Sequence, residues 1–259
     1  MYGWPELRDA TDALWAALRP RLLAAGFEGA PEALERDRPS AEVWADPGLL
    51  LSQTCGMPHV AGVSRAARIV AAPVYEVEGC GAGRYSSALV ARAGEAPAAV
   101  EGLAGRRLAL NGPDSLSGWA AAVSALGAEA IGPTLVTGAH RESIVAVAEG
   151  RADWAAIDAV AWAHALRFEP AAGALAVVGW SESAPAPPFI TSALTESGGR
   201  ARLRAALVET LADPETAPIR AELRLARLVA FADTDYDAAR RLARLAGAAA
   251  AGRADLAGA

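Results

Sequence analysis

The feature that most constrains the fold is an alternation of strand-like and helix-like segments through the middle third of the chain. Short apolar runs are each followed by a turn and then by apolar residues at spacings of three and four. The predicted strands cover 106–111, 134–137, 154–157 and 174–180, and the predicted helices cover 115–126, 142–149 and 159–166. Alternating strands and helices are typical of βα units, so we expect an α/β fold with a mostly parallel sheet.

The flanking segments suggest a second lobe. A helix is predicted over 7–22 and a short one over 40–44, with strands over 49–54 and 67–72, the latter ended by Pro73. A glycine-rich loop is expected over 78–84, and helices over 200–211, 218–229 and 236–246, with Gly247 closing the last. Strand-like segments at 85–92 and 189–194 flank the middle block. If both are crossovers, residues 1–86 and 188–259 form lobe one, residues 87–187 form lobe two, and a cleft lies between them.

Composition excludes several classes of protein. The chain has 259 residues, 53% hydrophobic and 21% charged, which is enough apolar surface for a core and excludes a disordered tail. The net charge is -6, and a nucleic-acid-binding protein needs a basic face. No apolar run approaches the roughly 20 residues of a membrane span, and no secretory signal is recognisable in the chain as given.

A first candidate site follows the strand at 106–111. The sequence Asn111-Gly-Pro-Asp-Ser-Leu-Ser-Gly118 predicts a turn that opens a helix among hydroxyl residues. Free N–H groups at a helix N-terminus bind oxyanions, Ser115 and Ser117 add hydroxyl donors, and Gly118 allows close approach of a ligand. The alternative is a plain serine N-cap with nothing bound.

Two further strand ends carry polar residues. His140 lies where the segment Thr137-Gly-Ala-His-Arg-Glu-Ser143 opens a helix, and it either donates to an anion or caps and packs. Asp158 ends a buried strand, where a carboxylate is usually an N-cap but can pair with an amine on a ligand. Because ligands bind at the carboxyl ends of parallel strands, these residues together favour an anion-binding cleft.

Other kinds of site find no support. The three histidines lack the spacing of metal ligands, and there is no P-loop, no G-x-S-x-G motif and no dinucleotide-binding glycine motif after a strand. We therefore predict no metal, no cofactor and no catalytic residue. The two cysteines, Cys55 and Cys80, are either two separate thiols or one disulfide in an oxidising compartment.

Taken together, these motifs resemble the phosphate, phosphite and phosphonate-binding components of ABC transporters. The resemblance rests on the order and spacing of three segments, 103–118, 137–144 and 148–158, and extends from about residue 49 onward. Tyr85 and the residues after it resemble the family's first hinge strand, and Asp235-Tyr236-Asp237 resembles its C-terminal motif. The strand that normally precedes the loop at Tyr2 has no counterpart in the chain as given, and Gln53-Thr54-Cys55-Gly56 looks like a feature of a subgroup.

The resemblance implies a type II periplasmic-binding-protein fold, in which two α/β lobes close on a ligand. It also implies that an oxyanion sits on the helix that opens at Ser115, with His140 beside it and Asp158 facing an amino group on the ligand. The expected ligand-binding residues are Tyr2, Gln53, Thr54, Tyr85, Ser115, Leu116, Ser117, Gly118, His140 and Asp158. Cys55 and Cys80 then lie on the same lobe, where a disulfide between them is expected if the protein is exported.

The function expected from this resemblance is capture of a small oxyanion, a phosphonate or phosphate ester, for ABC-type uptake. The expected partners are the ligand and an ABC permease, and we expect a monomer in the periplasm. Without a signal segment, the cytoplasm is the alternative location. The alternative functions are an enzyme on the same fold that acts on a small carboxylate or a pyrimidine precursor, with His140 and Asp158 as acid and base, or a ligand-sensing protein.

Overall fold

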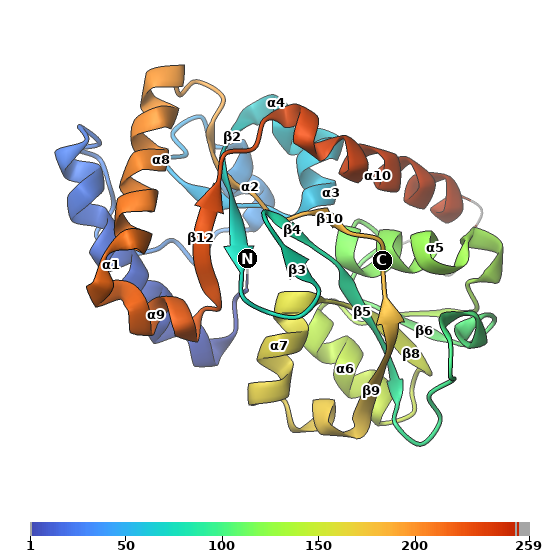
Figure 1. Cartoon of the computed structure of the whole chain (residues 1–259). Helices are drawn as coiled ribbons and strands as arrows, with labels where there is room; N and C mark the ends of the chain where they lie inside the picture. The colour runs from blue at the N-terminus through green and yellow to red at the C-terminus, as the bar shows by residue number, and fades with distance from the viewer. Residues whose placement is uncertain (1, 252, 254–259) are drawn as a thin grey trace.

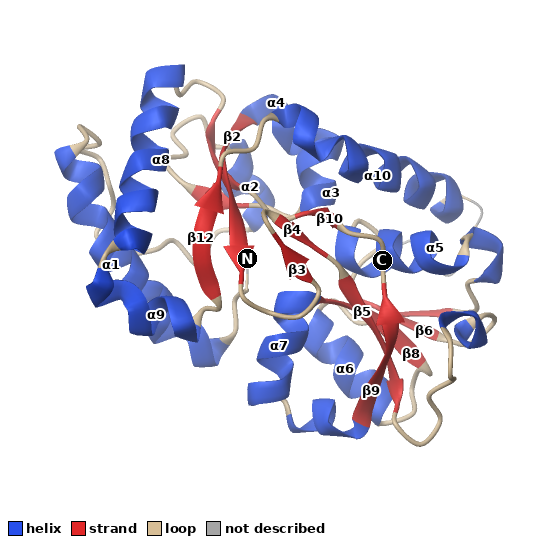
Figure 2. Cartoon of the chain, in the orientation of Figure 1, coloured by secondary structure: helices blue, strands red, loops and turns tan. Residues whose placement is uncertain are grey.

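The computed structural model of the chain describes residues 2–251 and residue 253. Its strands form two larger sheets with helices outside them, and a small sheet of three short strands lies between the two (Figure 1, Figure 2). This is the two-lobed α/β architecture that the sequence predicts. Within the described part of the chain, no helix combines the length and the apolar character that crossing a membrane requires.

Lobe one is built on an antiparallel sheet of four strands. Across the sheet these are β1 (Ser52–Gln53), β11 (Phe189–Ser192), β2 (Ala67–Tyr75) and β12 (Leu225–Val229). Its helices are α1 (Arg8–Ala24), α2 (Ser40–Ala45), α3 (Gly56–Pro58), α4 (Ser64–Ala66), α8 (Ser197–Ala212) and α9 (Ala217–Glu222). The apolar faces of α1 and α8 pack together, with Trp15, Leu18 and Leu203 among the buried residues.

Lobe two has a mixed sheet of five strands. Across the sheet these are β7 (Thr134–Val136), β6 (Leu108–Leu110), β8 (Trp154–Asp158), β5 (Ser87–Arg92) and β9 (Leu175–Trp180). Strand β6 is parallel to both β7 and β8, so the carboxyl ends of these three strands meet at one edge. The helices η4 (Leu116–Ala120) with α5 (Ala121–Leu126), α6 (His140–Ala148) and α7 (Ala159–Phe168) begin at that edge. The predicted βα units are therefore confirmed. The expectation of a mostly parallel sheet in each lobe is wrong, because every strand pair of lobe one is antiparallel and β5 of lobe two is antiparallel to both β8 and β9.

A small sheet and the last helix connect the lobes. Strands β3 (Cys80–Gly81) and β4 (Arg84–Tyr85) pair where a glycine-rich loop was expected, and β10 (Ala184–Pro185) pairs with β4. Helix α10 (Asp237–Ala250), red in Figure 1, contacts α3 of lobe one and also η4 and α5 of lobe two. The remaining short helical segments are η1 (Pro5–Leu7), η2 (His59–Val63), η3 (Val100–Leu103), η5 (Ala128–Ala130), η6 (Pro170–Ala174), η7 (Pro214–Thr216) and η8 (Asp233–Tyr236).

The prediction of one helix over 218–229 is wrong. Helix α9 stops at Glu222, and β12 begins at Leu225 and pairs with β2. Between them Arg224 has a left-handed backbone, with φ of 56°. That conformation ends a helix but is normally taken by glycine, so the sequence carries no sign of the turn.

The predicted C-terminal ends of one strand and of the last helix are also wrong. Strand β2 continues through Pro73 to Tyr75, because β11 pairs with β2 only as far as Ala71 and a proline is tolerated where one neighbour is missing. Helix α10 continues past Gly247 to Ala250. A glycine costs about 1 kcal/mol in a helix, and the indole of Trp119 compensates by donating to the carbonyl of Ala246 at 2.9 Å.

Candidate functional site

The candidate site begins where β8 ends and α7 begins. Asp158 is 3% exposed, and its Oδ1 accepts hydrogen bonds from the N–H groups of Val160 at 2.8 Å and Ala161 at 3.1 Å. Its Oδ2 accepts one from the hydroxyl of Tyr2 at 3.1 Å. The carboxylate therefore caps a helix of lobe two and also binds the N-terminal segment.

Burial is the main influence on the charge of Asp158. It raises the pKa of this carboxyl from 3.8 to about 6, although the three hydrogen bonds lower it. The carboxylate in turn raises the pKa of five other groups, which therefore lie within electrostatic range of it. These groups are Tyr2, Tyr75, Tyr85, Cys55 and Cys80.

The second part of the site is the start of the helix that follows β6. Ser115 is its N-cap, and its Oγ accepts from the N–H of Gly118 at 2.9 Å. The Oγ of Ser117 lies 2.8 Å from Nε2 of His140, at the start of α6. Two hydroxyls and an imidazole from neighbouring βα junctions thus come together, as the shared edge of the strands predicts.

His140 is uncharged in this cluster. Burial lowers its pKa from 6.5 to about 4, so the ring is neutral at pH 7. Its Nδ1 is buried and makes no hydrogen bond. A neutral imidazole carries one N–H, which can donate to an oxyanion.

Lobe one supplies polar side chains from β1 and β2. The amide of Gln53 donates to the hydroxyl of Tyr75 at 3.1 Å and to the carbonyl of Pro187 at 3.0 Å. The rings of Tyr2 and Tyr75 meet edge to face, with centroids 5.4 Å apart. Tyr75 was not predicted, because the expected strand stopped before it. The sequence did carry a signal for Tyr75, since this polar side chain stands at the end of a strand, as Asp158 does.

Tyr85 connects the two parts of the site. It lies on β4, is 2% exposed, and its hydroxyl makes no hydrogen bond. Its pKa is raised by burial and by the neighbouring Cys55 and is lowered by Ser117. A buried phenol without a partner is available to a ligand.

Three predicted ligand residues have other contacts. A Cβ on Gly118 would lie 2.0 Å from Oδ1 of Asn111, so that side chain fills the space expected for a ligand. Thr54 is fully buried and donates to the carbonyl of Cys55 at 3.3 Å. The side chain of Leu116 lies against Gly56 of lobe one. Gly118 and Thr54 thus contact other residues of the protein at the places where ligand contacts were expected.

Cys55 and Cys80 are free thiols in the structure, so the expected disulfide is not formed in it. Burial raises the pKa of both, that of Cys80 to about 12. Both are therefore neutral thiols at pH 7. Among the described residues there is no group of three or more histidine, cysteine or acidic side chains that could hold a metal ion.

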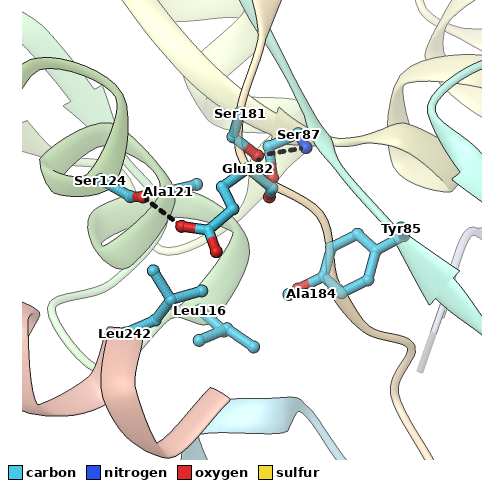
Figure 3. A pocket seen from close by; sticks show the side chains of 9 residues that line it. All are labelled: Tyr85, Ser87, Leu116, Ala121, Ser124, Ser181, Glu182, Ala184 and Leu242. Atoms are coloured by element: carbon cyan, nitrogen blue, oxygen red, sulfur yellow. Dashed lines mark hydrogen bonds between the residues drawn. The ribbon is translucent and has the colours of Figure 1, made fainter. Parts of the chain in front are cut away.

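A small cavity adjoins the site (Figure 3). It shares Tyr85 and Leu116 with the site, and its other lining residues come from β5, α5, the linker after β9, β10 and α10, including Ser124, Leu242 and Glu182. Its volume is about 10 Å³, which suits a single water and no larger molecule. This cavity is therefore not the ligand site.

Comparison with known proteins identifies a family for this arrangement. A family model described as an ABC transporter phosphonate periplasmic substrate-binding protein matches residues 51–236. No curated protein sequence matches the chain.

Several solved structures share the fold. A binding protein component of an ABC phosphonate transporter from Pseudomonas aeruginosa is 18% identical, with a TM-score of 0.72 over 93% of this chain and 84% of that one. PhnD1 from Prochlorococcus marinus, solved with methylphosphonate, is 14% identical, with a TM-score of 0.65 over 79% and 81%. A Xanthomonas citri protein bound to ATP is 14% identical, with a TM-score of 0.68 over 93% and 95%.

Proposed function

Because the chain belongs to the family of periplasmic phosphonate-binding proteins of ABC transporters, we propose that it binds a phosphonate or phosphate ester between its lobes. The family resemblance drawn from the sequence is confirmed, and with it solute binding. Which solute binds, and through which residues, is the proposal.

The observation that carries it is the pairing of Ser117 with His140 at the start of a helix. These groups are 2.8 Å apart and bond each other. An oxyanion beside them that replaces this bond would accept a hydrogen bond from each. Ser115 and the buried hydroxyl of Tyr85 lie at the same end of the helix. No lysine or arginine is required, because a helix N-terminus carries about half a positive charge.

The other end of the site suits a cation. Asp158 accepts a hydrogen bond from Tyr2, whose ring packs against that of Tyr75, and carboxylates and aromatic faces both attract ammonium groups. An ammonium there would pair with Asp158. An aminophosphonate, with an anion at one end and an ammonium at the other, matches both halves, so we favour it over a simple phosphonate.

The enzyme alternative has weaker support. The family consists of transport components. A serine beside a histidine resembles a nucleophile and its base, but Nδ1 of His140 lacks the hydrogen-bonded acid that orients such a base. We therefore propose binding without turnover.

The family also implies partners and a location. We propose that the protein works in the periplasm and delivers its ligand to an ABC permease, with the boundaries 1–86 with 188–259 and 87–187 for the two lobes. Ligand contacts with both lobes would favour the closed form. Small-angle scattering should then show a smaller radius of gyration at saturating ligand.

Isothermal titration calorimetry tests the proposal directly. The ligands are 2-aminoethylphosphonate, methylphosphonate and inorganic phosphate, with β-alanine as a control that keeps the amine but lacks the tetrahedral oxyanion. We expect the aminophosphonate to bind most tightly and β-alanine not to bind. If none of the three phosphorus compounds binds tighter than millimolar, the proposed anion site is wrong.

A further inference from the structure

Residues 2–7, which we call the strap, dock on lobe two, although the helix that follows them packs on lobe one. Trp4 and Leu7 are buried in a cluster whose other buried members all come from lobe two. Helix α1 begins at the next residue, Arg8, and packs against α8 of lobe one. The strap is therefore a further connection between the lobes, besides the small sheet and helix α10.

Helices α6 and α7 hold two side chains of the strap. The ring centroid of Trp4 lies 6.4 Å from that of His164 and 6.3 Å from that of Phe168. The guanidinium of Arg141 lies 4.8 Å from the centroid of the same indole, where an aromatic face attracts a cation. Its Nη1 also donates to Oε1 of Glu6 at 3.0 Å. Arg141 therefore anchors the strap to lobe two through both Trp4 and Glu6.

Arg141 has fixed partners within lobe two as well. Its Nε donates to Oε2 of Glu169 at 2.7 Å, and its Nη2 donates to the carbonyl of Phe168 at 3.2 Å. An isolated ion pair between exposed side chains contributes little, because both must be ordered to form it. Here the guanidinium is already ordered by lobe two, so its contacts with the strap require less additional ordering.

The anchored strap places Tyr2 at the carboxylate of Asp158. The hydroxyl donates to Oδ2 at 3.1 Å, and the ring packs edge to face on Tyr75 of lobe one. The other oxygen, Oδ1, already accepts from the N–H groups of Val160 and Ala161. A hydroxyl and an ammonium group both donate hydrogen bonds. An ammonium group that pairs with this carboxylate therefore meets the hydroxyl of Tyr2 at Oδ2.

We propose that Tyr2 takes the place of the ligand's ammonium group and that its anchors, Trp4 and Arg141, set how strongly the site selects amine-bearing ligands. The inference rests on the proposed function and gives Tyr2 a role other than that of a ligand contact. While the strap is firmly held, an amine must displace the hydroxyl, which reduces the gain from pairing with Asp158. A looser strap lessens that reduction. Trp4 and Arg141 are positioning residues, since they act through Tyr2.

Calorimetry of Tyr2→Phe at pH 8 tests the inference, with 2-aminoethylphosphonate and methylphosphonate as ligands. The variant removes only the competing hydroxyl and keeps a ring against Tyr75. Burial raises the pKa of Asp158 to about 6, so this carboxyl is ionised at pH 8. We expect the affinity for the aminophosphonate to rise about fivefold, the equivalent of one net hydrogen bond, and that for methylphosphonate to stay within about twofold. An unchanged preference for the amine, or weaker binding of both ligands, would overturn the inference.

The gain must also depend on Asp158. In the Asp158→Asn background no carboxylate is present for which a hydroxyl and an ammonium compete, so Tyr2→Phe should leave both affinities within about twofold. This non-additivity is expected of direct competition and not of a general change in the packing of the lobes. A gain that persists in the double variant would contradict the inference.

The anchors are tested with Tyr2 left in place. Glu6→Arg puts a like charge opposite Arg141 and should raise the affinity for the aminophosphonate by about two- to threefold, the scale of a partly exposed ion pair. Trp4→Leu removes the aromatic face beside the same guanidinium and should act in the same direction. The matched control is Glu149→Arg, because Glu149 pairs with Arg151 at 2.8 Å, in an ion pair that does not include the strap. Equal affinities in Glu6→Arg and the control would exclude the anchors from selectivity.

These outcomes separate the inference from the proposed function. If the unmodified chain binds both phosphonates and Tyr2→Phe gains no affinity for the amine, the function stands and the role of Tyr2 fails. If neither ligand binds any of these chains more tightly than millimolar, the proposed function fails and the inference fails with it.

Discussion

The hydroxyl of Tyr2 donates a hydrogen bond to Oδ2 of Asp158 at 3.1 Å, across 156 positions of the chain. The other oxygen of the same carboxylate accepts from the first turn of α7. One side chain therefore stabilises a helix start and attaches the N-terminal segment to lobe two. An ammonium group in the site would compete with Tyr2 for Oδ2, which leaves the helix cap intact. Structure and ligand binding can thus be separated by mutation.

Asp158→Asn should remove the preference for an amine and leave the fold intact. Asparagine caps helices about as well as aspartate, so we expect a stability change of less than about 1 kcal/mol. The affinity for 2-aminoethylphosphonate should fall to that for methylphosphonate, because only the charge is lost. Calorimetry and thermal melts measure the two effects. An unchanged preference for the amine would place the ammonium elsewhere.

The pH dependence of binding should reflect the same carboxyl. Burial raises the pKa of Asp158 to about 6, so below that pH the group is protonated in the folded protein and cannot pair with an ammonium. The ratio of affinities for 2-aminoethylphosphonate and methylphosphonate should fall by about tenfold per pH unit below pH 6 and be constant above it. His140, with a pKa of about 4, stays neutral over most of that window.

The ammonium group lowers the second phosphonate pKa of 2-aminoethylphosphonate relative to that of methylphosphonate, so the ratio also contains the titration of the ligands. Asp158→Asn is the control for this contribution, and the ratio in the unmodified protein is divided by the ratio in the variant at each pH. A quotient that is flat from pH 5 to 8 would show that Asp158 does not face the amine.

Ser117→Ala should weaken the binding of every phosphonate. It removes one charge-assisted hydrogen bond to the anion, which costs about 1–2 kcal/mol, or roughly 5- to 30-fold in affinity. Ser124→Ala is a matched control, because Ser124 is on the same run of helix but donates to Glu182 at 3.2 Å, outside the site. Calorimetry that finds equal affinities for the two variants would remove Ser117 from the ligand contacts.

Much of lobe two could be predicted from the sequence, because its signals are local. Strand and helix periodicities alternate there, and Ser115 and Asp158 each stand between a strand and a helix, where caps belong. The parallel strands then bring these helix starts to one edge. The partner of Asp158 could not be found in this way, since Tyr2 reaches it only through the packing of both lobes.

The features that were missed depend on contacts distant in sequence. Tyr75 reaches the site because β2 runs past Pro73, which requires β12 beside it and no β11 at that level. Gly56 meets the side chain of Leu116 only when the lobes are packed together. The strand β12 itself was hidden, because the spacing of its apolar residues continues that of α9.

Arg224→Gly should stabilise the protein. Arg224 adopts φ of 56° between α9 and β12, where a side chain on Cβ is strained and glycine is not. Relief of that strain is worth about 1 kcal/mol, partly offset by the greater freedom of glycine in the unfolded chain, so we expect a net gain of about 0.5 kcal/mol. Arg227→Gly, in the middle of β12, is the opposite control and should destabilise, because glycine weakens a strand. Urea denaturation of both variants measures the free energies of unfolding, and a loss of stability in Arg224→Gly would mean that contacts of the arginine side chain outweigh its backbone strain.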